Sequence, residues 1–224
     1  MGPFVLKPVG SDHVLAPGGV TLASIFATEA KVVGYVSGVQ FNSFYSAILT
    51  CWDTRVFGTM RNMRCINLVA VESGEARPCF MAYTSEKILL VNAHAPQPNN
   101  VHLDTVFRKM NRAAQEIVPQ GETPRHVVMT GDFNDRGRVL DKGQTLLGVR
   151  LHPPRMIRTC CYDPGFGMNN GRYEFTGDYV VSDMRSRAVH RILPDGTLTN
   201  EDTAQPKVGR SDHEPVVATL ELEG

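Results

Sequence analysis

The chain has 224 residues, 42% of them hydrophobic, so it can bury a substantial core, and we expect a single domain over residues 1–224. Lysine plus arginine and aspartate plus glutamate each number 23, which excludes a strong overall basic field of the kind that attracts nucleic acid. The five cysteines are odd in number and lack CxxC spacing, which favours a reduced protein over a disulfide framework or a zinc site.

The first residues show no targeting signal. Residues 1–20 are rich in glycine and proline, lack the apolar core of a signal peptide and are predicted to be an irregular N-terminal segment. No apolar run approaches the roughly 20 residues of a membrane-spanning helix. We therefore expect an intracellular protein, cytoplasmic or nuclear, without a transmembrane segment.

Apolar runs in the first half of the chain predict a series of strands. Residues 21–30 fit either a helix or a strand, because their period is unclear. Short Ser-Gly-Glu and Ser-Glu sequences between the later runs suit hairpin turns, so a meander is expected. The predicted strands cover residues 47–51, 65–73, 77–85 and 87–95.

The clearest helical pattern in the chain follows this meander. Apolar residues repeat at three- and four-residue steps from Leu103 to Ile117; Asn99 or Asn100 can cap the start, and Pro119 follows the end.

The second half of the chain alternates short strands with loops. Residues 126–130 predict a strand, residues 137–147 a short helix, and residues 148–176 are rich in loop formers. Further strands are expected at residues 178–182, 188–193 and 215–222. A meander followed by a helix and separated strands predicts an α+β sandwich with mixed sheets.

Several of these strands border polar side chains. One run ends on Asn-Ala-His at His94, a second on Gly-Asp-Phe-Asn around Asp132, and Ser-Asp-His-Glu-Pro around Asp212 precedes the last strand. Buried strands that stop on carboxylate, amide and imidazole groups deliver them to one sheet edge. Taken singly, each has an ordinary structural explanation, such as a tight turn at Asp132, a buried histidine at His94 or a helix cap at Asp212.

Taken together, four ordered motifs resemble the endonuclease/exonuclease/phosphatase superfamily. They read Val-Asn-Ala-His at 91–94, Gly-Asp-Phe-Asn at 131–134, Gly-Asp-Tyr-Val-Val at 177–181 and Ser-Asp-His-Glu-Pro-Val at 211–216. The resemblance covers roughly residues 25–222 and is specific for the superfamily but not for a substrate. It implies a deoxyribonuclease I-like fold, in which two packed mixed β-sheets are flanked by helices in a four-layer α/β/β/α sandwich.

The resemblance also implies roles for individual residues. His213 would be a general base or would polarise the phosphate, and Asp178 would bond its other ring nitrogen. Asp132 would orient or activate the attacking water, while Asn134 and His94 would donate to non-bridging phosphate oxygens.

A divalent cation belongs to the same implied site. Glu29 and Asp212 would bind Mg²⁺ or Mn²⁺, since hard cations prefer oxygen ligands. The superfamily usually adds an asparagine from its first strand, but no asparagine precedes Asn42 here, and Thr28 stands where a glutamine usually precedes the metal-binding glutamate. The first strand is therefore expected to be missing or degenerate, which would hold Glu29 loosely.

The leading hypothesis is a metal-dependent phosphodiester hydrolase, an endonuclease or exonuclease acting on nucleic acid. The stretch before Asp178 lacks the Trp usual in abasic-site endonucleases, which argues against that specialisation. A phosphatase or phospholipase-type phosphodiesterase of the same fold is one alternative. A catalytically impaired binding module is another.

Overall fold

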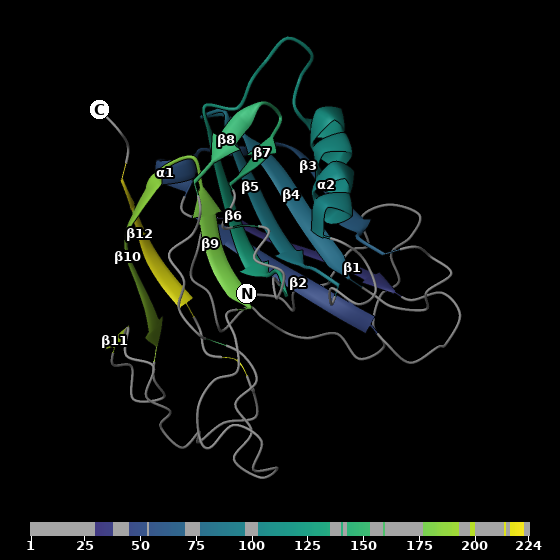
Figure 1. Ribbon diagram of the computed structural model, residues 1–224. Helices are drawn as coiled ribbons and strands as arrows, with labels where there is room; N and C mark the ends of the chain where they lie inside the picture. The colour runs from purple at the N-terminus through teal and green to yellow at the C-terminus, as the bar shows by residue number, and fades with distance from the viewer. Residues whose placement is uncertain are drawn as a thin grey trace, which may run out of the picture.

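The computed structural model describes the middle of the chain and parts of its C-terminal third. The described residues are 30–37, 45–52, 54–69, 77–96, 103–134, 140, 143–152, 159, 177–192, 198–199, 213 and 216–221. Their elements follow one another as in Figure 1: β1 (Ala30–Ser37), β2 (Tyr45–Trp52), α1 (Thr54–Phe57), β3 (Met60–Asn67), β4 (Pro78–Thr84), β5 (Ile88–His94), α2 (Leu103–Ile117), β6 (His126–Asp132), β7 (Gln144–Leu146), β8 (Val149–Leu151), β9 (Asp178–Ser182), β10 (Arg185–Ile192), β11 (Leu198–Thr199) and β12 (Val216–Glu221).

A five-stranded mixed sheet forms the centre of the described structure. Its strands run in the order β3-β4-β5-β6-β9; β5 and β6 are parallel, and the other neighbours are antiparallel. All residues of β4 are buried, and β5 is buried over its first four residues. Strands buried on both faces lose the alternation of apolar and polar residues, which explains the continuous apolar runs in the sequence.

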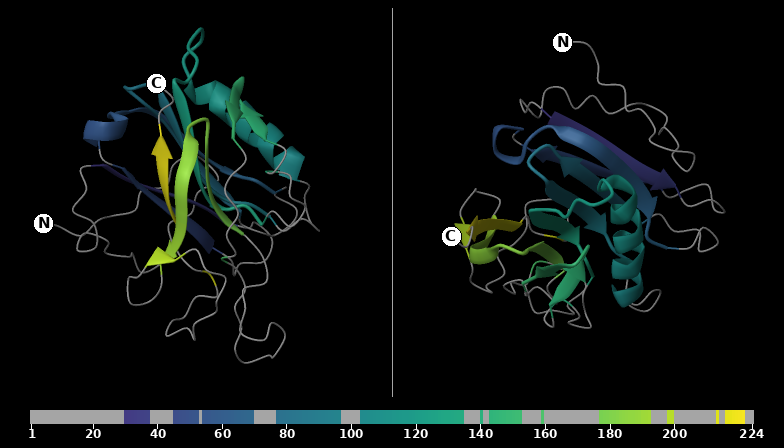
Figure 2. Two further views of the ribbon diagram at one scale, coloured as in Figure 1. Left: turned by 60° about the vertical axis from the view of Figure 1, so that its left-hand side comes forward. Right: turned by 90° about the horizontal axis from the view of Figure 1, so that it is seen from above.

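Helix α2 covers one face of this sheet. Its apolar stripe, which includes Val106, Met110 and Ile117, belongs to the same buried cluster as Met81 of β4 and Leu89 of β5. The right-hand view of Figure 2 shows α2 on one side of the sheet and the β1–β2 ribbon on the other. The apolar positions that predicted the helix from the sequence are therefore the positions that α2 buries against the sheet.

In the part of the chain that the structure describes, the opposite face packs mainly against strands. Trp52 of β2, Phe80 of β4 and Leu90 of β5 form a second buried cluster, and Leu220 of β12 packs against it. β1 and β2 contact β4, while β10 and β12, which pair in a three-stranded sheet with β11, contact β9. The α+β class expected from the sequence is confirmed, and the five-stranded sheet is mixed as expected. The other sheets of the described residues are antiparallel.

The predicted helix over residues 137–147 is wrong where the structure describes it. Gln144–Leu146 is strand β7, which pairs antiparallel with β8. The two residues between these strands, Leu147 and Gly148, have φ values of 52° and 80°. Positive φ at both central residues is typical of the tightest β-hairpin turns and interrupts a helix.

Other boundaries also differ from the predictions. β3 begins at Met60 and ends at Asn67, earlier than the predicted 65–73, and β10 begins at Arg185 rather than at residue 188. β1 was not predicted; it pairs with β2 along its whole length. The irregular segment predicted for residues 1–20 lies outside the described residues.

Within the described residues, no helix is both long enough and apolar enough to cross a membrane.

Candidate active site

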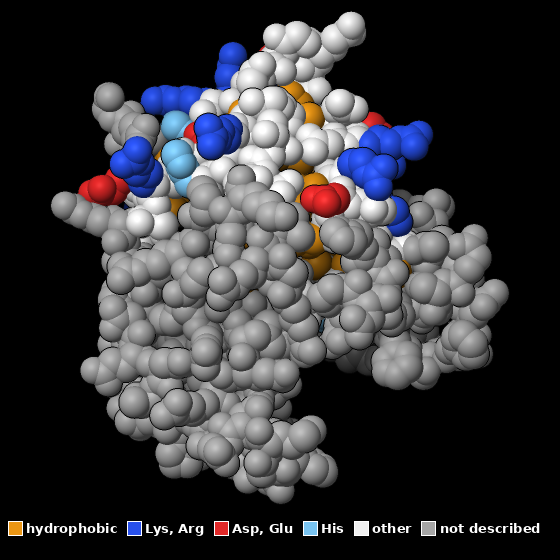
Figure 3. Space-filling view, viewed as in Figure 1, with side chains coloured by type: hydrophobic (Ala, Val, Ile, Leu, Met, Phe, Trp, Pro, Cys, Tyr) orange, Lys and Arg blue, Asp and Glu red, His pale blue; other side chains and the backbone are white. Residues whose placement is uncertain are grey.

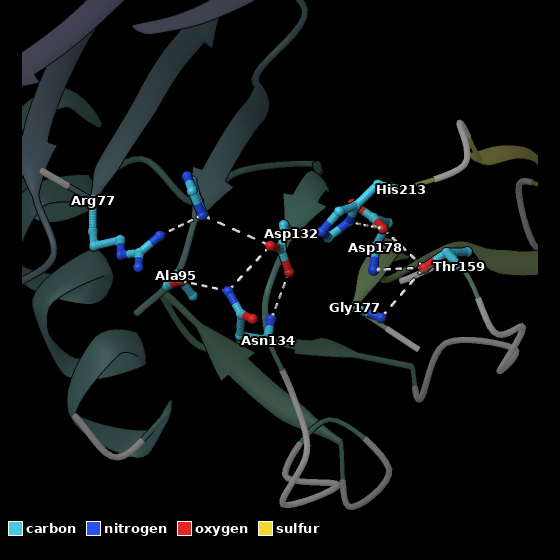
Figure 4. A network of polar contacts seen from close by, with 9 residues as sticks. Arg77, Ala95, Asp132, Asn134, Thr159, Gly177, Asp178 and His213 are labelled. Atoms are coloured by element: carbon cyan, nitrogen blue, oxygen red, sulfur yellow. Dashed lines mark hydrogen bonds and ion pairs between the residues drawn. The ribbon is translucent and has the colours of Figure 1, made fainter. Parts of the chain in front are cut away.

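Three neighbouring strands bring the predicted polar residues to one edge of the central sheet. β5 ends at His94 and β6 ends at Asp132, and these two residues are register partners in the parallel pair. β9 begins at Asp178, which is the antiparallel register partner of Asp132. The three motifs that are distant in the sequence therefore meet because the strands end side by side (Figure 4).

His213 and Asp178 form a hydrogen-bonded pair at this edge, as the sequence predicted. Nδ1 of His213 lies 2.8 Å from Oδ2 of Asp178. Since an ionised carboxylate only accepts hydrogen bonds, Nδ1 is the donor in this pair. The pair thus has the geometry of an imidazole oriented by an acceptor.

Thr159 holds Asp178 in this position. Its hydroxyl donates to Oδ2 of Asp178 at 2.8 Å and accepts from the backbone N–H groups of Asp178 and Gly177 at 3.1 and 3.3 Å. Thr159 is fully buried, so these bonds are shielded from water. Thr159 is not among the predicted site residues, because it lies in a loop-rich stretch without local periodicity.

Asp132 is braced by the turn that follows it. Backbone N–H of Asn134 donates to Oδ1 of Asp132 at 2.8 Å, and Nδ2 of Asn134 donates to Oδ2 at 3.1 Å and to the carbonyl of Ala95 at 2.9 Å. Asn134 has a φ of 48°, a left-handed conformation that asparagine tolerates better than most residues. In this geometry both Nδ2 hydrogens of Asn134 are used to fix the turn around Asp132.

The pKa of Asp132 is raised above its ordinary value. Burial of the carboxyl group is the largest cause, because it disfavours the charged form, and the nearby charge of Asp178 acts in the same direction. The backbone N–H of Asn134, His213 and Arg77 oppose the shift. Asp132 is therefore a carboxylate with an increased affinity for protons at the centre of the group.

His94 lies on the other side of Asp132. Its Nε2 is 3.7 Å from Oδ2 of Asp132 and 2.6 Å from Nη1 of Arg77. Arg77, which the sequence analysis also missed, directly precedes β4, and β4 pairs antiparallel with β5. Because the contact of Arg77 with His94 depends on this long-range pairing, the residues next to Arg77 in the sequence do not reveal it.

The structure brings together five of the seven predicted site residues: His94, Asp132, Asn134, Asp178 and His213. Figure 4 labels Asp132, Asn134, Asp178 and His213 in this group. The predicted metal ligands Glu29 and Asp212 lie outside the described residues. Among the residues that the structure does describe, no three histidine, cysteine, aspartate or glutamate side chains form a group able to hold a metal ion.

A second histidine–aspartate pair lies at the opposite end of β9. Nδ1 of His126 is 2.8 Å from Oδ2 of Asp183, which directly follows β9. The other carboxylate oxygen, Oδ1, accepts the backbone N–H of Val127 at 2.7 Å. This pair joins β6 to the end of β9. It makes the same histidine–aspartate contact as His213 and Asp178, but it does not lie beside Asp132.

The structure is similar to those of several members of the endonuclease/exonuclease/phosphatase superfamily, the group that the four sequence motifs resemble. A humanized D. rerio TDP2 with 14 mutations superposes with a TM-score of 0.47 at 13% identity, covering 86% of this chain and 85% of that chain. A truncated Caenorhabditis elegans TDP2 gives a TM-score of 0.46 at 15% identity, covering 89% and 76%. An AP endonuclease from Archaeoglobus fulgidus gives 0.42 at 14%, covering 86% and 89%.

At these scores the superpositions record a likeness and favour no particular substrate. No protein-family model matches the chain, and no curated protein matches it in sequence.

Proposed function

We propose that the chain is a metal-dependent phosphodiester hydrolase, with nucleic acid as the leading substrate class. The observation that supports this most directly is the hydrogen bond between His213 and Asp178 beside the carboxylate of Asp132. An oriented imidazole next to a carboxylate of raised pKa provides two groups suited to proton transfer.

Hydrolysis of a phosphodiester needs a water molecule to attack phosphorus. In the proposed reaction Asp132 orients this water and takes its proton, for which a raised pKa is an advantage. Nε2 of His213 hydrogen-bonds to a phosphate oxygen as negative charge develops there. The new bond joins the water oxygen to phosphorus, the ester P–O bond breaks, and the leaving oxygen takes a proton from solvent.

A divalent cation, Mg²⁺ or Mn²⁺, forms part of the proposal. Asp132 and Asp178 are register partners, and the charge of Asp178 helps to raise the pKa of Asp132. This excess of negative charge suits a cation bound beside the pair. Glu29 and Asp212 would hold the ion, and a bound ion would supply Lewis acidity to the phosphoryl group.

The distribution of charge bears on the choice of substrate. On the face seen in Figure 3, the described lysine and arginine side chains stand in separate groups at the two sides. The chain as a whole has a formal net charge of +0 at pH 7. We therefore expect a short contact with the phosphate backbone and a modest salt dependence of affinity for nucleic acid.

The test compares two variants that remove the same contact from the two ends of β9. His213→Gln removes the imidazole beside Asp132, and His126→Gln removes the imidazole beside Asp183. Both are assayed with a single-stranded DNA, an RNA, bis(4-nitrophenyl) phosphate and 4-nitrophenyl phosphate, in Mg²⁺, Mn²⁺ or EDTA. We expect His213→Gln to lower kcat by about 10²- to 10⁴-fold, the usual contribution of a positioned acid or base.

His126→Gln should leave kcat unchanged after correction for the folded fraction measured by circular dichroism. Equal loss of activity in the two variants, or full activity in EDTA, would contradict the proposal. Cleavage of the monoester alone would favour a phosphatase. Saturable binding of the oligonucleotides without hydrolysis of any substrate would favour a binding module.

A further inference from the structure

Arg77 is held firmly against the candidate site. Its backbone N–H donates to Oδ1 of Asn67 at 2.9 Å, and its carbonyl accepts the N–H of Leu68 at 2.8 Å. These two bonds tie the residue before β4 to the end of β3. The side chain then reaches His94 at the end of β5, where Nη1 of Arg77 lies 2.6 Å from Nε2.

The chemistry of the two groups decides which of them donates. A guanidinium group carries only N–H donors and stays protonated at any pH at which a protein is folded. Nε2 of His94 must therefore accept the hydrogen bond through its lone pair. An imidazolium ring, or the tautomer with a proton on Nε2, would direct one N–H against another at 2.6 Å.

The same ring nitrogen also faces Asp132, at 3.7 Å from Oδ2. Without Arg77, a proton on Nε2 would be stabilised by this nearby carboxylate, in an ion pair or a hydrogen bond. Arg77 removes that possibility, because it occupies the lone pair of Nε2. The positive charge on this side of Asp132 then resides on Arg77 rather than on His94.

We propose that Arg77 is a positioning residue that holds His94 as the neutral tautomer with its proton on Nδ1. His94 then donates only through Nδ1, and its ring does not compete with water for the carboxylate of Asp132. The value of this arrangement for catalysis rests on the proposed function. The tautomer itself does not, and it can be measured in the absence of any substrate.

The direct test is the tautomer of His94 in the unmodified protein. Uniformly ¹⁵N-labelled protein gives two-bond ¹H–¹⁵N correlations from its seven histidines, and the signals of His94 are those lost in His94→Gln. We expect Nδ1 to have the shift of a protonated ring nitrogen and Nε2 that of an unprotonated one. Protonation of Nε2 in this spectrum would overturn the proposal without any further variant.

Arginine variants test whether Arg77 is the cause. Arg77→Met removes the donor, and we expect Nε2 of His94 to become protonated toward Asp132. Arg77→Lys retains a donor and should keep the tautomer of the unmodified protein, at least in part. Arg112→Met, which removes an exposed arginine of α2, is the matched control and should leave the His94 signals in place. An unchanged tautomer in folded Arg77→Met would contradict the proposal.

Kinetics separate this inference from the proposed function. If Arg77 acts through His94, Arg77→Met should lower kcat on the order of 10- to 100-fold, as is usual for residues that orient a functional side chain. Arg77→Met combined with His94→Gln should then be no slower than His94→Gln alone. Additive losses would mean that Arg77 acts independently of His94, against the proposal.

The two hypotheses fail in different ways. The expected tautomer in a protein that hydrolyses none of the substrates would refute the proposed function and support the role of Arg77. Hydrolysis that depends on His213, in a protein whose His94 is protonated at Nε2, would support the proposed function and refute the role of Arg77.

Discussion

Gly131, the residue before Asp132, is a position where the addition of a single methyl group should strongly lower stability. Gly131 lies in β6 with a φ of 129°, a conformation that residues with a side chain rarely adopt. A Cβ atom at this position would overlap the carbonyl oxygen of Ala93 in the neighbouring strand β5 and lie 2.9 Å from its carbonyl carbon. These obstacles are backbone atoms of a paired strand, so they cannot move aside as a flexible side chain can.

The expected cost of Gly131→Ala has two parts. A backbone conformation unsuited to a side chain costs about 1–3 kcal/mol. Crowding of a well-packed interior costs about 1–3 kcal/mol more. The sum, about 2–6 kcal/mol, is a large share of the 5–15 kcal/mol by which a typical domain is stable. Because Asp132 is the next residue, we also expect hydrolytic activity to fall with the displacement of its carboxylate.

Gly121→Ala provides the matched control. Gly121 has a φ of 83°, but a Cβ atom there would meet nothing within 4 Å. This variant therefore carries the conformational part of the cost, about 1–3 kcal/mol, without the clash. Urea unfolding followed by circular dichroism gives the free energy of unfolding of both variants by linear extrapolation. A Gly131→Ala variant no less stable than Gly121→Ala would refute the reasoning from the contact with Ala93.

Three further predictions concern the carboxylate, the core and the metal. Because the pKa of Asp132 is raised, its carboxyl group binds a proton more tightly in the folded protein than in the unfolded chain. The stability that this carboxyl group contributes is therefore present at low pH and is lost as pH rises through the folded pKa. Asp132→Asn should therefore gain stability relative to the unmodified protein as pH rises above the ordinary value of 3.8, and a difference in unfolding free energy that is constant with pH would contradict this. Leu89→Ala, at a fully buried position of β5, should cost about 2–5 kcal/mol in urea unfolding, whereas Val56→Ala, at a residue that is 62% exposed, should change stability by less than about 0.5 kcal/mol. In calorimetric Mg²⁺ titrations Asp212→Ala should weaken binding more than Glu29→Ala, because a degenerate first strand would hold Glu29 loosely, and the reverse order would contradict that expectation.

The features that the sequence alone determined are those with a local physical cause. The spacing of apolar residues from Leu103 to Ile117 matches the period of a helix that buries one stripe, and α2 has these bounds. The apolar runs predicted β5 and β9 almost to the residue, and the first four residues of β5, which are all buried, need no polar alternation. The sequence therefore assigns the polar residues at the ends of these strands to one edge of a sheet.

Tertiary structure decided the features that depend on which distant segments meet. The hairpin of β7 and β8 depends on positive φ values at Leu147 and Gly148, and apolar residues nearby resembled a short helix in the sequence. Arg77 reaches His94 only because β4 pairs antiparallel with β5, and Thr159 reaches Asp178 across 19 positions of the chain. A hydrogen bond between segments far apart in the sequence leaves no period in either of them, because its geometry is set by strand register and chain path rather than by local residue preference.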